Sequence, residues 1–148
     1  PVTPVPARFE AQFAAWRVRS REQILANLAE RQEQVLDARA PGRFTGTLPE
    51  PWPGRRRGRI PGSLNLDHAT LMNADGTLKP PSELRALVDA AGIDFERPIV
   101  TSCGSGITAC VLAFVLERLG HTRTAVYDGS WAEWGLPGDL PIETGAPR

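Results

Sequence analysis

The chain alternates, from one end to the other, between short apolar runs of strand length and longer runs with the periodicity of a helix. Alternation of this kind predicts an α/β fold in which helices cover both faces of a parallel sheet. A length of 148 residues allows one such domain. The expected strands are "WRVRS", "QVLDAR", "SLNLD", "RPIVTS" and "TAVYDG", and the expected helices are "SREQILANLAERQ", "PPSELRALVDAAG", "GITACVLAFVLERLG" and the single turn "SWAEWG".

The ends of the helices carry their own signals. Ser20 and Gln23 have the spacing of a capping box, and Ser82 is expected to cap the second helix. Gly92 and Gly120 are expected to stop the second and third helices. Residues 41–62, rich in Gly, Pro and Arg, are expected to form a long loop, and long loops in compact domains are often functional.

Charge and composition exclude several classes of protein. Basic and acidic residues balance at 17 each, so no overall field favours nucleic acid, and no apolar run reaches the length of about 20 residues that crosses a bilayer. The opening stretch, residues 1–17, reads as a linker between domains or an N-terminal extension, and residues 18–148 read as the folded domain. Cys103 and Cys110 are too few for a disulfide framework, and free thiols favour the cytoplasm.

Cys103 is the strongest candidate for a catalytic residue. It follows the buried strand "PIVTS" and precedes a glycine-rich turn that opens a helix, at the sheet edge where α/β proteins bind ligands. The first backbone amides of a helix lack internal partners, so they stabilise an anion there, including a thiolate. The position therefore predicts an activated nucleophile, with a buried structural cysteine as the alternative. Cys110, between apolar neighbours, is expected to lie in the core.

Other chemistries match the same stretch less well. Gly104 to Ala109 matches the glycine pattern of a dinucleotide site, but only one strand and a tail follow it, too little for the rest of that fold. A cysteine phosphatase needs an arginine at the end of the loop, where this chain has Ala109. The cysteines and the two histidines show none of the spacings of a zinc site.

The combination of "CGSGITA", "VYDGSWAEWG", "DARAPGRFTGTLPEPWPG" and "GRIPGSLNL" resembles the rhodanese superfamily. More closely, it resembles the catalytic, C-terminal domain of the two-domain 3-mercaptopyruvate sulfurtransferases. The resemblance covers the chain from about residue 9 to its end. It implies a rhodanese-like parallel sheet and a second, N-terminal rhodanese domain that this sequence does not contain.

The resemblance also implies a mechanism. Cys103 takes sulfur from 3-mercaptopyruvate as a persulfide, and thioredoxin, another thiol or cyanide then removes it, with no metal or organic cofactor. Arg43 matches the family arginine that grips the substrate carboxylate, and Ser105 matches a serine that relays a proton. Asp37, at a strand end, is expected to steady the loop or to orient Arg43. The loop that would hold the persulfide is Gly104, Ser105, Gly106, Ile107 and Thr108.

The chain departs from the family pattern at two points. Trp52 stands where a second carboxylate-binding arginine is usual, so Arg55 is the candidate replacement, and Arg59 stands where the family usually has histidine. Neutral residues after Cys103 favour mercaptopyruvate over the dianion thiosulfate. The alternatives are a thiosulfate sulfurtransferase and a noncatalytic module that carries sulfur or docks on a partner. Trp131 and Trp134 are expected to pack near the mouth of the site.

Overall fold

The computed structural model describes residues 7–146, so part of the predicted linker, residues 1–6, lies outside the described residues. A five-stranded sheet, entirely parallel, forms the centre in the order β1-β5-β4-β2-β3. This confirms the predicted class and the position of each predicted strand. The strands are β1 (Val18–Arg19), β2 (Gln34–Asp37), β3 (Leu64–Asn65), β4 (Ile99–Ser102) and β5 (Thr124–Tyr127).

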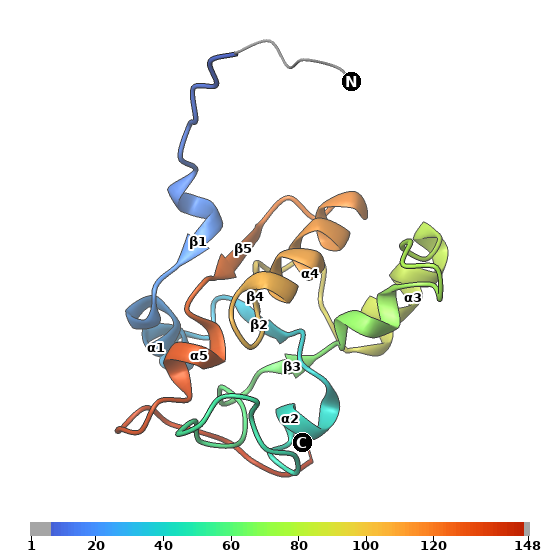
Figure 1. Cartoon of the computed structure of the whole chain (residues 1–148). Helices are drawn as coiled ribbons and strands as arrows, with labels where there is room; N and C mark the ends of the chain where they lie inside the picture. Colours follow the sequence, from blue (N-terminus) through green and yellow to red (C-terminus); the bar gives the residue numbers. More distant parts are fainter. Residues whose placement is uncertain (1–6, 147–148) are drawn as a thin grey trace.

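Helices cover both faces of the sheet (Figure 1). On one face lie α1 (Arg21–Glu30) and the short α5 (Ser130–Trp134), which follows β5. On the other lie α3 (Pro81–Ala90) and α4 (Ile107–Arg118). The remaining helical turns are α2 (Pro41–Phe44), η1 (Ala15–Arg17) and η2 (His68–Leu71).

The two faces have separate hydrophobic cores because side chains alternate along each strand. In β2, Leu36 packs with the α3–α4 core and Val35 with the α1–α5 core. In β4, Ile99 and Val100 divide in the same way. Every residue of β2 and β4 is buried, as expected for central strands of a parallel sheet.

Most predicted helix ends are confirmed. Ser20 and Gln23 form the capping box, and Gly92 and Gly120 follow their helices with positive φ. The prediction for Ser82 was wrong, because α3 begins at Pro81 and Pro80 is its N-cap residue. Proline is favoured at the first helical position since it has no N–H to satisfy. The expected loop 41–62 contains α2, whose first residue is again a proline.

The parallel sheet brings the carboxyl ends of β2, β4 and β5 to one edge. The segments that follow them are α2 with its loop, the Cys103 loop and α5, so these three meet there. No helix within residues 7–146 is long and apolar enough to cross a membrane.

Candidate active site

Cys103 lies one residue beyond β4, where the sequence predicted it. Its residue is 1% exposed and it packs in the α3–α4 core. Its backbone is held by α5, because its amide donates to Ser130 Oγ at 3.0 Å and its carbonyl accepts from the Trp131 amide at 3.0 Å. The Ala132 amide also donates to the carbonyl of Gly104 at 2.7 Å. The start of the loop is thus fixed by the helical turn that follows β5.

The backbone amides of residues 104–109 are the main polar feature of the loop. Among the described residues none of them donates a hydrogen bond to a backbone or side-chain acceptor. The first amide of this region that does so is that of Cys110, which donates to Gly106 at 3.2 Å. These amides belong to the loop and to the first turn of α4, where the partial positive charge of the helix adds to theirs. The arrangement can stabilise negative charge next to Cys103.

Two glycines allow this loop to pack closely. Gly106 has φ +85°, and a Cβ there would come within 2.8 Å of the carbonyl oxygen of Asp128. A Cβ on Gly104 would come within 2.9 Å of both Arg43 Nη2 and the ring of Trp52. Glycine at position 104 therefore lets Arg43 and Trp52 lie directly over the backbone next to Cys103.

Arg43 comes from α2 and takes part in a network of alternating charges. It donates to Glu50 through Nη2 at 2.5 Å and through Nε at 3.3 Å. Glu50 also accepts from Arg39 Nη1 at 2.9 Å, and Arg39 Nη2 binds the Asp37 carboxylate at 2.7 Å. The side chain of Arg43 is 24% exposed, whereas those of the other three are 1–2% exposed. The network thus presents a single partly exposed guanidinium to the loop.

Asp37 does not orient Arg43, which was one of the two roles expected for it. It binds Arg39, and Glu50 instead bridges Arg39 and Arg43. The reason is position: Asp37 ends β2 and Arg39 is two residues away, so the two side chains pair locally, and Glu50 is the second carboxylate of the buried Arg39 guanidinium. Arg39 also lies over the ring of Trp131, 4.4 Å from its centroid.

Trp52 and Arg55 lie on the loop that follows Glu50. The Trp52 residue is 38% exposed, and the Arg43 guanidinium is 5.7 Å from its ring centroid, within range of a cation–π contact. Arg55 is half-buried and donates through Nε to the carbonyl of Ala132 at 2.8 Å. Its two terminal nitrogens make no hydrogen bond within residues 7–146.

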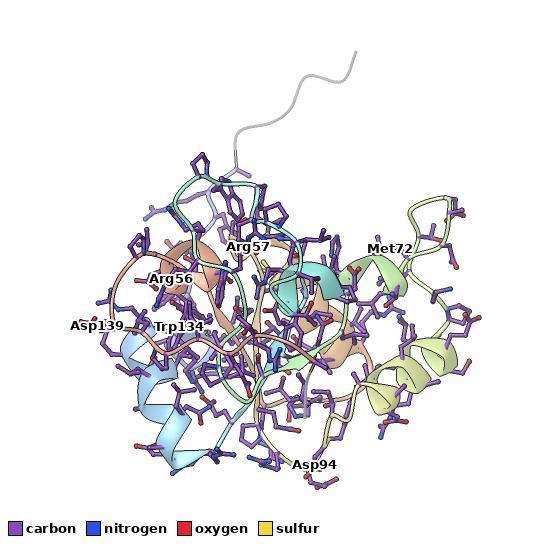
Figure 2. All side chains as sticks on the ribbon, turned by 90° about the horizontal axis from the view of Figure 1, so that it is seen from below. Arg56, Arg57, Met72, Asp94, Trp134 and Asp139 are labelled. Atoms are coloured by element: carbon purple, nitrogen blue, oxygen red, sulfur yellow. The ribbon has the colours of Figure 1, made fainter. Side chains whose placement is uncertain are left out.

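The other arginines of this loop have structural roles or none. Arg56 donates to the carbonyls of Trp134, Gly138 and Leu140. Figure 2 shows it beside Trp134, the last residue of α5. Arg57, next to it, is exposed and makes no polar contact with described residues. Arg59 is buried and donates to the carbonyl of Gly145 at 2.6 Å.

The remaining predicted residues of the site differ in exposure. Ser105 is exposed and its hydroxyl makes no hydrogen bond within the described chain. Ile107 is exposed at the start of α4 and Thr108 is half-buried. Trp131 and Trp134 are fully buried in the α1–α5 core, with Trp131 alone bonded to the Cys103 loop through its backbone.

The expectation that Cys110 lies in the core was wrong. It is exposed, because it falls on the face of α4 that also carries Ile107 and Phe114 and that no other element covers within residues 7–146. The sulfur of Cys110 is nevertheless partly buried. This burial, together with the nearby Cys103 and Asp128, raises the pKa of Cys110. Its thiol is therefore less ionised at neutral pH than an ordinary one.

Sequence reasoning did not find Glu50, Arg39 or Ser130 as parts of the site. Ser130 is a buried residue with φ +48°, and its hydroxyl joins the Cys103 amide to the carbonyl of Tyr127. A serine directly after "DG" at the end of a strand was the only signal for it. Within residues 7–146 no group of His, Cys, Asp or Glu side chains is arranged to hold a metal ion.

The comparisons with known proteins agree with this geometry. Residues 20–136 match the family model described as Rhodanese-like domain. The chain is 42% identical over 139 residues to thiosulfate/3-mercaptopyruvate sulfurtransferase 1, mitochondrial, of Arabidopsis thaliana, covering 94% of this chain and 37% of that protein. It is 42% identical over 131 residues to 3-mercaptopyruvate sulfurtransferase of Homo sapiens, covering 88% of this chain and 44% of that protein.

A solved structure agrees as well. The crystal structure of the Tum1 protein from Saccharomyces cerevisiae superposes with a TM-score of 0.79 at 29% identity, over 87% of this chain and 47% of that one. The chain thus spans less than half the length of these relatives. With its all-parallel sheet, its cysteine at the carboxyl end of β4 and a family match over most of its length, this chain belongs to the rhodanese family.

Proposed function

We propose that this chain is the catalytic domain of a sulfurtransferase that takes sulfur from 3-mercaptopyruvate and carries it as a persulfide on Cys103. The observation that carries this proposal is the position of Cys103 beside the backbone amides of residues 104–109, which donate no hydrogen bond among the described residues. A persulfide ends in a negatively charged sulfur, and convergent amides at a helix start stabilise such a charge. The sulfurtransferase names of the relatives support the same reaction class.

The first half-reaction forms a sulfur–sulfur bond and breaks a carbon–sulfur bond. The Cys103 thiolate attacks the sulfur of mercaptopyruvate, and the electron pair of the C–S bond passes to the substrate carbon as the enolate of pyruvate. The proton of the transferred S–H group goes to that carbon, which gives pyruvate and leaves Cys–S–S⁻. Ser105, exposed at the loop with a free hydroxyl, is our candidate for relaying this proton.

The second half-reaction returns the enzyme to its starting state. A thiolate acceptor attacks the outer sulfur, takes it as a new persulfide, and releases the Cys103 thiolate. Thioredoxin, another thiol or cyanide would serve as acceptor. No further cofactor takes part, because the sulfur travels on the protein itself.

Arg43 is our candidate for binding the substrate carboxylate. Its Nη2 lies over Gly104, and its Nη1 makes no hydrogen bond among described residues, so one donor group is free for a ligand. Arg55 is the second candidate, since its terminal nitrogens are unpaired within residues 7–146 and Ala132 links it to the loop. The neutral Gly104 and Ser105, together with an Arg43 guanidinium already paired with Glu50, suit a monoanion better than thiosulfate.

The alternatives lead to different results. A thiosulfate sulfurtransferase would load Cys103 faster from thiosulfate than from mercaptopyruvate, and a noncatalytic carrier or docking module would load it from neither. We also propose a second rhodanese domain as partner, because the relatives are more than twice as long as this chain. Residues 18–148 would form the catalytic unit and residues 1–17 the linker. The cytoplasm stays our prediction for the compartment, on the basis of the free thiols.

The direct test is mass spectrometry of the whole chain after incubation with mercaptopyruvate at neutral pH. Wild type and Cys110→Ser should each gain the mass of one sulfur atom, removable by a small thiol, whereas Cys103→Ser should gain none. Neutral pH favours this selectivity, because the raised pKa of Cys110 keeps its thiol largely protonated. A gain that persists in Cys103→Ser, or no gain in wild type, contradicts the proposal.

A further inference from the structure

Trp52 is an exposed aromatic ring in contact with the catalytic loop, and the proposed mechanism gives it no role. Its ring carbons Cη2 and Cζ3 lie 2.9 and 3.1 Å from the position that a Cβ on Gly104 would take. Gly104 directly follows Cys103, so the ring lies against the residue next to the proposed nucleophile. Its residue nevertheless keeps 38% of its surface exposed, which leaves part of the ring free for a ligand.

The charges around the ring limit what that ligand can be. Arg43 is the cation nearest the loop, and Glu50 already neutralises it through two of its nitrogens. Arg55 donates through Nε to the carbonyl of Ala132, and its terminal nitrogens make no hydrogen bond among the described residues. A dianionic donor would need both guanidiniums to replace its hydration, whereas a monoanion needs only the free donor of Arg43 and the loop amides.

The exposed Trp52 ring over Gly104 favours an organic group on that monoanion. An aromatic ring beside a guanidinium binds flat apolar groups through stacking as well as through burial.

We infer that Trp52 is a specificity-determining residue: it disfavours dianionic donors, and among monoanionic thiosulfonates it favours those with a flat apolar group. This inference rests on the proposed function, since it needs Cys103 to accept sulfur. The anionic end of the donor faces Arg43 and the loop amides, and its organic group packs on the free part of the Trp52 ring.

Thiosulfonates provide matched probes, because their organic group can change while the reacting sulfur stays the same. The Cys103 thiolate attacks the outer sulfur of R–SO₂–S⁻, an S–S bond forms to Cys103, the S–S bond of the donor breaks, and the sulfinate R–SO₂⁻ leaves with the electron pair. Charge is conserved, and no oxidant is needed. The measured quantity is the second-order rate of sulfur loading on Cys103, compared between benzenethiosulfonate and methanethiosulfonate.

The expected result is a change in the ratio of these two rates. Trp52→Ala should lower the phenyl-to-methyl ratio by about threefold to tenfold relative to wild type, the range expected for one aromatic contact. Trp52→Phe should keep most of the ratio, and Trp52→Arg should also raise the rate with thiosulfate, because a second guanidinium then faces the loop. Comparison between variants cancels the intrinsic difference in reactivity of the two donors.

Trp16 provides the matched control. It is also an exposed tryptophan, at 55%, with an arginine guanidinium 4.5 Å from its ring centroid. It precedes β1 and so lies at the amino edge of the sheet, opposite the Cys103 loop. Trp16→Ala should leave the ratio unchanged. Circular dichroism of each variant checks that the fold is kept.

The outcomes separate this inference from the proposed function. Loading of Cys103 with the same phenyl-to-methyl ratio in wild type and Trp52→Ala overturns the role of Trp52 and leaves the sulfurtransferase proposal standing. No loading of Cys103 by either thiosulfonate or by mercaptopyruvate overturns both. An equal fall of the ratio in Trp16→Ala also overturns the inference, because the effect would then not be local to the loop.

Discussion

At the scale of single residues, the proposed substrate contact depends on how one guanidinium is shared. Arg43 gives two nitrogens to Glu50, and we propose that its third, which makes no hydrogen bond among the described residues, binds the donor carboxylate. Arg43→Gln should therefore raise the concentration of mercaptopyruvate that half-saturates loading of Cys103 by about tenfold or more, since a charge-assisted hydrogen bond is lost. Arg57→Gln, at an exposed arginine without polar contacts in the described chain, should not change it. An equal effect of both would indicate general electrostatics rather than binding by Arg43.

The sequence pointed to residues with a direct chemical signature and not to those that act through others. Cys103 became the proposed nucleophile because it stands between an apolar strand and a glycine-rich turn, and Arg43 became the proposed carboxylate-binding residue through the family resemblance. Glu50 could not be assigned, because its importance comes from bridging Arg39 and Arg43, which only the folded loop brings together. Cys110 was placed in the core on its apolar neighbours, but exposure depends on which face of α4 remains uncovered.

At the scale of elements, α5 holds the Cys103 loop in place. Ser130 has φ +48° and its hydroxyl satisfies the buried amide of Cys103. Ser130→Ala should lower the free energy of unfolding by about 1–3 kcal/mol, because that amide then lacks an acceptor. Ser130→Gly should cost less, since glycine relieves the strained φ. Urea denaturation of both measures this order, and an Ala variant more stable than the Gly variant would contradict the claim that the φ of Ser130 is strained.

Elements with a periodic pattern were predictable, and short elements fixed by tertiary contacts were not. The strand and helix alternation gave every strand of the sheet, and the capping box fixed the start of α1. The turn α2 was missed because it is four residues long inside a Gly- and Pro-rich stretch. Its start at Pro41 uses the same proline signal that begins α3 at Pro81, so this signal was stronger than the serine cap expected there.

At the scale of the whole molecule, residues 143–146 bind the 41–62 stretch that carries Arg43, and we call this C-terminal segment the strap. Arg59 donates to the carbonyls of Gly145 and Ala146, and the Gly145 amide donates to the carbonyl of Thr45, which follows α2. Arg59→Lys should speed hydrogen exchange at the amides of Glu143 and Gly145, because an ammonium cannot reproduce the planar fork of donors. Protection equal to wild type would mean that the backbone bridge alone holds the strap.

A matched substitution controls for the loss of an arginine. Arg123→Lys changes an exposed arginine that directly precedes β5 and donates to one carbonyl, that of Glu96. Exchange at the strap should not respond to it. The strap itself was not predictable, because Arg59 differs from the histidine usual in the family and nothing local to it indicates that it binds residues more than 80 positions away.

The pairing of β1 with β5 has a consequence for synthesis on the ribosome. Val18 and Arg19 pair with Val126 and Tyr127, and among the described residues β1 has no other neighbour in the sheet. During synthesis β1 therefore stays unpaired until β5 has left the exit tunnel, although the central strands β2 and β4 can pair before then. In that interval the edge of β4 that β5 later covers is exposed, so a chaperone that shields strand edges would act on this domain then.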